Sequence, residues 1–267
     1  MFAAVLGAAA AAVVLFLTLP VLAVFLDTGP ARLLEALAEP GAREALELSL
    51  RTTAAAMALI VLVGTPGAYF LATRRFRGRD AVITLVELPL VLPPAVAGIA
   101  LLASVGPAGI LGGVLHRAGI ELALQTAGVV VALTFVASPF YVRQAQAAFA
   151  AIDPALVDAS RTLGASEART FARVVLPNAR AGLVAGGALA FGRALGEFGA
   201  TLMFAGSFAG VTQTVPLAIY ARFATDFEAA LALSAVLVAV SAGLLLAVKL
   251  LAREAVPGPG ALGRGAH

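Results

Sequence analysis

Long apolar runs alternate with short polar loops along most of the chain. Six of these runs approach the roughly 20 residues that a helix needs to cross a bilayer. They cover residues 7–26, 52–72, 82–105, 124–142, 181–205 and 229–251. The pattern therefore predicts an all-α integral membrane protein with six transmembrane helices in one domain, residues 1–267. A soluble protein with buried helices is the alternative, and six such runs strongly disfavour it.

The composition supports a membrane location. Only 12% of the residues are charged and 61% are hydrophobic, whereas a soluble domain carries about 25% charged residues. The chain has no cysteine, which excludes disulfides and thiolate metal sites. His116 and His267 show no metal-ligand spacing. The first 20 residues lack the basic start of a signal peptide, so we expect them to form a retained first span.

The basic residues predict the orientation, because positive charge collects in cytoplasmic loops. Twelve of the 18 basic residues fall on one side of the predicted bundle and five on the other, with Arg193 inside a span. The twelve are Arg74, Arg75, Arg77, Arg79, Arg143, Arg161, Arg169, Arg173, Arg180, Lys249, Arg253 and Arg264; the five are Arg32, Arg43, Arg51, Arg117 and Arg222. Both termini and residues 151–180 are therefore expected in the cytoplasm of a multi-pass inner-membrane protein. This distribution explains the basic pI without a nucleic-acid partner.

Two segments outside the spans have distinct compositions. Residues 27–51 carry leucines at helical spacing and predict a short amphipathic connection on the outer side. This connection is either a solvated linker, the simpler interpretation, or a surface for a partner. Residues 252–267 are rich in glycine and proline and are expected to be a disordered tail.

A polar, arginine-rich segment, residues 151–180, separates the fourth and fifth predicted spans. Asp153 followed by Pro154 is typical of a helix start. An apolar face follows at helical spacing, and Gly164 predicts the end of this short helix. The residues of that face are Leu156, Ala159, Ser160 and Leu163.

A second short helix is predicted directly afterwards. Ser166 can cap it, and Pro177 is expected to redirect the chain into the fifth span. Its apolar face comprises Ala168, Phe171, Ala172 and Val175. Such short helices cannot bury an apolar face alone, so they either pack on their own bundle or dock on another protein. The residues by themselves leave both possibilities open.

The fifth span contains an ionisable pair. Arg193 and Glu197 are spaced i, i+4, and Arg193 lies roughly 20 Å along the helix from Arg180. A charge at that depth is costly, so the pair should face the bundle interior or a water-filled path. It either lines the pathway or acts as a structural ion pair. On another face, a smooth stripe is formed by Gly192, Gly196, Gly199 and Met203.

The third span is interrupted by prolines at positions 89, 93 and 94, and Gly98 follows one turn later. Broken helices at membrane depth are tolerated where protein or water satisfies the freed backbone groups. Pro93, Pro94 and Gly98 are therefore gate candidates, with a static kink as the alternative.

The segment Asp158–Pro177 resembles the cytoplasmic loop of permease subunits of type I ABC importers. That family pattern is EAA, three residues, G, nine residues, I, one residue, and LP. This chain matches the spacing throughout, with DAS, Gly164, Val174 and Leu176-Pro177, and departs mildly at three residues. The resemblance implies coupling helices that seat in a groove of the ATP-binding subunit. The implied docking residues are Asp158, Ala159, Ser160, Leu163, Gly164, Ala165, Val174, Leu176 and Pro177.

Three further stretches, LPLVLPPAVAG, ALGEFGATLMFAG and TQTVPLAIY, resemble the molybdate/tungstate branch of these permeases. The sulfate/thiosulfate branch is the near relative and the alternative. The resemblance implies transport of a tetrahedral oxyanion. The pathway or gate candidates are Arg193, Gly196, Glu197, Gly199, Thr201, Pro93, Pro94 and Gly98.

The chain lacks the G-x-x-x-x-G-K-[ST] loop that holds nucleotide phosphates. We therefore expect no cofactor in this chain and no enzymatic activity of its own. The resemblance implies a dimer of ATP-binding subunits that use ATP and Mg²⁺, a second permease copy, and an extracytoplasmic binding protein that docks near residues 27–51 and 207–228. An ion-coupled secondary transporter would need an internal repeat, and an intramembrane enzyme a nucleophile or metal cluster. The sequence shows none of these.

Overall fold

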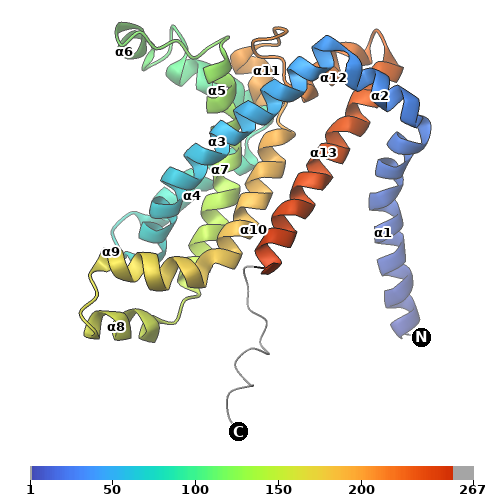
Figure 1. Ribbon diagram of the computed structural model, residues 1–267. Coiled ribbons are helices and arrows are strands. Elements are labelled where there is room, and N and C mark those ends of the chain that lie inside the picture. The colour runs from blue at the N-terminus through green and yellow to red at the C-terminus, as the bar shows by residue number, and fades with distance from the viewer. Residues whose placement is uncertain (1, 255–267) are drawn as a thin grey trace. The chain divides into compact units, whose positions relative to one another are not determined.

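The computed structural model describes residues 2–254, and these residues form helices joined by turns and loops (Figure 1). The all-α prediction is confirmed for this part of the chain, which contains no strand. The predicted tail began at residue 252. Residues 252–254 instead complete the last helix, and the remainder lies outside the described residues.

The first seven helices are α1 (Phe2–Asp27), α2 (Pro30–Ala38), α3 (Pro40–Thr73), α4 (Arg79–Val91), α5 (Pro94–Val105), α6 (Gly112–Arg117) and α7 (Thr126–Ala150). They are followed by α8 (Pro154–Thr162), α9 (Glu167–Thr170), the π-helical turn η1 (Phe171–Val175), α10 (Leu176–Leu195), α11 (Gly199–Ala205), α12 (Val215–Phe223) and α13 (Phe227–Glu254).

Five helical runs within residues 2–254 are long and apolar enough to cross a membrane. These runs are Phe2–Asp27, Pro40–Thr73, Thr126–Ala150, Glu167–Leu195 and Phe227–Ala247. They correspond to five of the six predicted spans. The remaining predicted span, residues 82–105, is not one continuous helix, because it breaks between α4 and α5 at Leu92 and Pro93. Two adjacent prolines explain the break, since each lacks a backbone N–H and restricts the residue before it.

The fifth predicted span, residues 181–205, is also divided. Its long helix ends at Leu195, and the chain resumes helical structure only at Gly199. Gly196 lies at the end of α10, and Phe198 precedes α11 with a φ of −128°. The span predicted from hydropathy is therefore a long helix followed by a short one.

The helices form two compact units. The first comprises the chain up to Ser49 together with Ser207–Gly243. Its core contains Ala42, Val215 and Leu233, and the Val215 N–H donates a 2.8 Å hydrogen bond to Ser49 Oγ. The amphipathic connection predicted over residues 27–51 is helical, and Glu39 in it lies 2.5 Å from Arg222.

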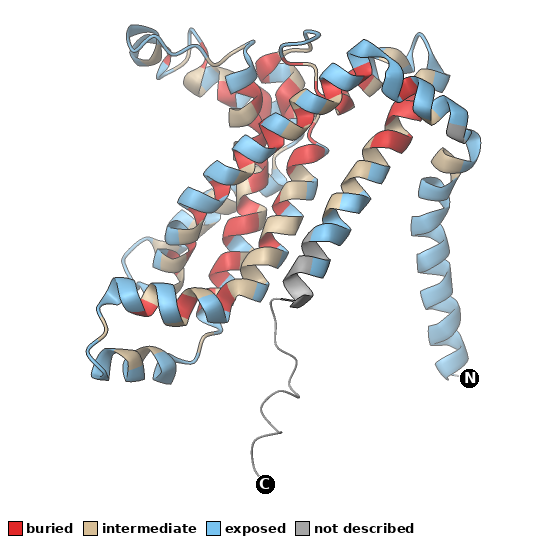
Figure 2. Ribbon diagram, viewed as in Figure 1, coloured by how far each residue is buried: buried red, intermediate tan, exposed pale blue. Residues whose placement is uncertain are grey.

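The second unit comprises Leu50–Gly206 with the described residues from Leu244 to Glu254. The helix α7 lies at its centre and packs against α10, α4, α11 and α5. Figure 2 shows the buried residues concentrated along α7 and the helices beside it. Gly186 lets α10 approach closely, because a Cβ at this position would lie 2.9 Å from the side chain of Gln144. This close packing of small residues is typical of helix contacts in lipid.

Candidate functional site

The arginine-rich segment lies at one end of the second unit. Figure 1 shows α8 and α9 beside the lower ends of α7 and α10, far from α5, α6 and α11 at the upper end. The segment predicted to be cytoplasmic is therefore separated along the long helices from the two helix breaks.

The local structure of this segment confirms three predictions. Asp153 Oδ1 accepts a 2.9 Å hydrogen bond from the Ala155 N–H at the start of α8. Ser166 Oγ accepts a 3.4 Å hydrogen bond from the Arg169 N–H at the start of α9. Gly164 follows α8 with a φ of +78°, in the left-handed region that favours glycine. These residues fix the sharp joint between the two short helices.

Three aromatic rings attach the joint to the bundle. Phe171 lies 4.8 Å from Tyr69 at the end of α3 and 6.2 Å from Phe149 at the end of α7, measured between ring centroids. Tyr69 and Phe149 pack edge to face at 5.4 Å. Val175 is buried in the adjoining core. The second short helix therefore follows any movement of the α3 and α7 ends.

The first short helix, α8, makes fewer contacts with the rest of the bundle than the second. Val157 packs against the core, and the hydroxyls of Ser160 and Thr170 lie 3.0 Å apart. Leu156 and Leu163, by contrast, are 46% and 88% exposed. Only one residue of the predicted apolar face, Ser160, packs against the rest of the protein. Leu156, Ala159 and Leu163 are exposed. Pattern alone could not locate the covered side of so short a helix.

The second predicted apolar face is split in the same way. Phe171 and Val175 pack inward, whereas Ala168 and Ala172 are exposed. The helical run continues through Pro177 from α9 to α10, and Figure 1 shows it turning from α9, which lies across the view, into the rising α10, as predicted. The π-helical turn η1 ends at Val175, two residues before Pro177. A π-helix bonds each carbonyl to the N–H five residues on, rather than four, and this looser turn accommodates a proline, which has no backbone N–H to donate.

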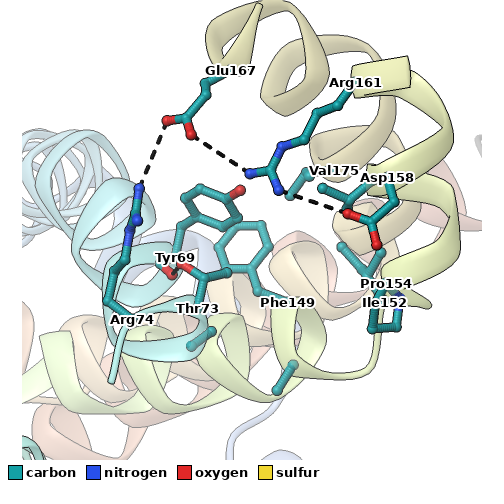
Figure 3. A pocket seen from close by; sticks show the side chains of 13 residues that line it. Tyr69, Thr73, Arg74, Phe149, Ile152, Pro154, Asp158, Arg161, Glu167 and Val175 are labelled. Carbon is teal, nitrogen blue, oxygen red and sulfur yellow. Dashed lines mark hydrogen bonds and ion pairs between the residues drawn. The ribbon is translucent and has the colours of Figure 1, made fainter. Parts of the chain in front are cut away.

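A cavity of about 420 Å³ lies between α8 and the ends of α3 and α7 (Figure 3). Charged side chains connect across it: Glu167 lies 3.7 Å from Arg74 and 3.6 Å from Arg161, and Arg161 lies 3.8 Å from Asp158. All four side chains are largely exposed, and such pairs typically contribute under about 1 kcal/mol each. The aromatic cluster, rather than these ion pairs, provides the main attachment.

We expect Phe171→Ala to weaken that attachment. Removing the ring eliminates both aromatic contacts and costs roughly 1–3 kcal/mol, less than a fully buried phenylalanine because Phe171 is only partly covered. The unfolding temperature of the purified protein should fall by several degrees. The charge-removing variant Glu167→Gln is the matched control, and its unfolding temperature should stay close to that of the wild type. A larger decrease in Glu167→Gln than in Phe171→Ala would contradict this ranking.

The two helix breaks of the second unit lie side by side. A Cβ at Gly199 would lie 2.6 Å from Pro94 Cβ, and a Cβ at Gly98 would lie 2.6 Å from Met203 Cβ and 2.7 Å from the Ala200 carbonyl oxygen. The half-helices α5 and α11 therefore pack in direct backbone contact. Pro93, Pro94, Gly98 and Gly199, which the sequence placed in different spans, are brought together here.

The ionisable pair lies at the second break. Arg193 Nη2 is 2.5 Å from Glu197 Oε2, and Glu197 Oε1 accepts a 2.7 Å hydrogen bond from the Ala200 N–H. The Glu197 side chain is 1% exposed and that of Arg193 is 29% exposed. A carboxylate so deeply buried requires compensation by a cation or by hydrogen bonds. Glu197 receives both, and it links α10 to the first turn of α11.

The predicted glycine stripe is not a single packing surface. Gly199 packs against Pro94, whereas no described atom outside the neighbouring backbone lies within 4 Å of a Cβ built at Gly192. Gly196 is exposed, and Thr201 is fully buried in α11. The break at Gly196 separates the two halves of the stripe, so helical spacing could not be extended across it.

Sequence reasoning missed two features. The aromatic cluster combines Tyr69, from the second predicted span, with Phe149, which lies beyond the predicted end of the fourth span at residue 142, and no local pattern connects them. Glu87 lies 2.8 Å from Arg143 and links α4 to α7. In the sequence, the only sign of this ion pair was that Glu87 and Arg143 carry opposite charges near the same predicted membrane face.

The fold and these features define a multi-pass helical membrane protein. The chain belongs to the family of binding-protein-dependent transport system inner membrane components, whose sequence profile matches residues 64–256.

The chain is similar over most of its length to molybdenum and sulfate transport permeases. The chain is 44% identical to the molybdenum transport system permease protein ModB of Mycobacterium tuberculosis, over 88% of this chain and 89% of that protein. It is 40% identical to a probable molybdenum ABC transporter permease of Haloferax volcanii, over 90% and 86% of the two chains. The sulfate transport system permease protein CysT of Escherichia coli is 34% identical, over 92% and 90%.

Solved structures share the fold. One chain of a bacterial ABC transporter involved in the import of the acidic polysaccharide alginate superposes with a TM-score of 0.75 over 95% of each chain, at 17% identity. The inward-facing MetNI methionine ABC transporter gives a TM-score of 0.61 over 81% of this chain and 95% of that one, at 19% identity. The expected ABC importer permease fold is therefore confirmed.

Proposed function

We propose that this protein is the membrane permease of an ATP-driven importer that carries molybdate or tungstate into the cytoplasm. The single observation that carries the proposal is the 44% identity to a molybdenum transport permease, which extends over 88% of the chain. The identity to the sulfate permease is lower, at 34%. Both ions are tetrahedral oxyanions, so sulfate import is the second candidate.

We assign the docking of the ATP-binding subunit to residues 158–177. The exposed Ala159 and Leu163 support this assignment, because together with Leu156 just before the segment they form an apolar surface on a polar stretch. A partner subunit that covers this surface would gain hydrophobic contact area. The aromatic cluster then transmits movement of the docked subunit to α3, α7 and α10.

The remaining components follow from this assignment. A dimer of ATP-binding subunits supplies ATP and Mg²⁺ and hydrolyses the nucleotide. A second permease copy completes the pathway, and an extracytoplasmic binding protein delivers the anion. In support, one structural neighbour is a transporter in complex with a substrate-bound periplasmic protein. The basic residues favour an orientation with both termini and residues 151–180 in the cytoplasm.

The function is tested by ATPase measurements in proteoliposomes. The permease is reconstituted with an ATP-binding subunit and an oxyanion-binding protein from the same organism, and molybdate, tungstate or sulfate is added in turn. We expect molybdate or tungstate to raise the ATPase rate several-fold and sulfate to leave it near the basal rate. Binding of each anion to the binding protein is measured separately as the control.

The possible outcomes distinguish the candidates. Stimulation by sulfate alone would assign the chain to sulfate import. No stimulation by any anion, with the binding protein shown to be loaded, would reject oxyanion import altogether. Anion uptake that persists without ATP would instead indicate a secondary transporter.

A further inference from the structure

The Arg193–Glu197 pair is asymmetric in a way that a purely structural ion pair does not require. Glu197 is 1% exposed, whereas Arg193 is 29% exposed. The carboxylate is thus enclosed by the helices of the second unit, and the guanidinium reaches the surface of the chain.

Each oxygen atom of the carboxylate faces a partner. Oε1 accepts the hydrogen bond from the Ala200 N–H, and Oε2 faces Arg193 Nη2. Rotation of the carboxylate would therefore disrupt the first turn of α11 or release Arg193. Glu197 holds the guanidinium at one position relative to the break between α10 and α11.

The surface beside Arg193 is open. Gly192 and Gly196 are exposed on the same stretch of α10, and a Cβ at Gly192 would contact no other described group within 4 Å. Charged side chains inside a membrane face the bundle interior or a water-filled path rather than lipid. The exposed edge of Arg193 therefore faces a water-filled path or another protein chain rather than lipid.

The guanidinium retains donors for a passing anion. It carries five N–H groups in a planar fork, and the contact with Glu197 involves Nη2. A tetrahedral oxyanion accepts hydrogen bonds from such a fork. An unneutralised arginine at this depth would hold a dianion firmly, whereas transport requires contact weak enough for release.

We propose that Glu197 is a positioning residue for anion passage. It fixes the Arg193 guanidinium at the exposed edge of α10 and neutralises it, so that a tetrahedral oxyanion makes contact there without being retained. This inference rests on the proposed import of an oxyanion, and it adds the group that the anion meets inside the membrane.

The test uses Glu197→Gln, because the glutamine carbonyl oxygen can still accept the Ala200 N–H while the negative charge is removed. The permease and its ATP-binding subunit are assembled in nanodiscs without the binding protein. Retention of radiolabelled molybdate is measured, with sulfate and chloride as competitors. We expect Glu197→Gln to retain at least tenfold more molybdate than the wild type, sulfate to compete, and chloride to compete weakly. The double variant Arg193→Gln/Glu197→Gln should lose the gain.

Transport provides the second measurement. In proteoliposomes with the loaded binding protein, Glu197→Gln should reduce the rate of anion uptake several-fold, since release becomes slow. Arg193→Lys should also slow uptake, because a lysine keeps the charge but lacks the planar fork. This second variant keeps the test decisive if thermal unfolding shows that Glu197→Gln is unstable.

The proposal is overturned if Glu197→Gln folds normally and retains no more anion than the wild type. It is also overturned if the double variant keeps the gain, or if Arg193→Lys transports at the wild-type rate. Failure of the proposed function gives a different result. In that case the wild-type complex imports neither molybdate nor sulfate from a loaded binding protein, and this result does not depend on how much anion Glu197→Gln retains.

Discussion

Replacing Gly164 with valine should reduce transport and substrate-stimulated ATPase activity at least tenfold. Gly164 has a φ of +78° at the joint between α8 and α9. The left-handed conformation costs a residue with a Cβ about 1–2 kcal/mol, and a β-branched residue more. No described atom lies within 4 Å of a Cβ at this position, so the effect is conformational rather than steric. Valine should shift the joint and displace α8 from the position that the proposed docking requires.

Gly164→Asn is the matched control, because asparagine tolerates the left-handed region better than other residues with a side chain. It adds comparable bulk to the same exposed position and should retain most of the activity. Uptake of radiolabelled molybdate and ATP hydrolysis are measured in the same proteoliposomes. Equal activity of the valine and asparagine variants would show that the conformation of Gly164 does not matter for coupling.

The local features of residues 151–180 were predictable from sequence because each depends on neighbouring residues. Asp153 and Ser166 cap helices through backbone groups two or three residues away, and Gly164 ends α8 through its own backbone conformation. The existence of five long apolar helices was predictable for the same reason, since length and hydropathy are local properties, although the helix predicted over residues 181–205 runs over Glu167–Leu195.

The covered faces were not predictable, because they depend on contacts between distant segments. Phe171 packs inward since Tyr69 and Phe149 lie beside it, and neither is close to it in sequence. The inward side of α8 is set by Val157 and Ser160, although Leu156 and Leu163 are the more prominent apolar residues of the pattern. Short helices offer too few positions for periodicity to distinguish these faces.

The interruptions of the spans were only partly predictable. Adjacent prolines indicated the break before α5, but the break after Leu195 has no proline. There the chain contains Gly196 and the buried Glu197, whose carboxylate accepts the Ala200 N–H in place of a backbone carbonyl. The sequence identified Glu197 as a charged residue at membrane depth, and the structure adds its contact with the first turn of α11.

Enlarging Gly98 should have the second large effect, because it would separate α5 from α11. A Cβ at Gly98 would lie 2.6 Å from Met203 Cβ and 2.7 Å from the Ala200 carbonyl oxygen. The methionine side chain could move, but the carbonyl belongs to the backbone of α11 and cannot move without shifting that helix. Overpacking of this kind typically costs about 1–3 kcal/mol. We expect Gly98→Ala to reduce anion uptake several-fold and Gly98→Val at least tenfold.

The measurements are anion uptake in proteoliposomes and the thermal unfolding of the purified complex. Gly187→Ala is the matched control on α10, since a Cβ there has no described neighbour within 4 Å, and it should behave as the wild type. Gly199→Ala provides an independent check, because its Cβ would lie 2.6 Å from Pro94 Cβ on the same interface. If α5 and α11 must remain in contact for transport, Gly98→Ala and Gly199→Ala should fail together. Wild-type uptake in both variants would show that close contact between the two half-helices is not needed.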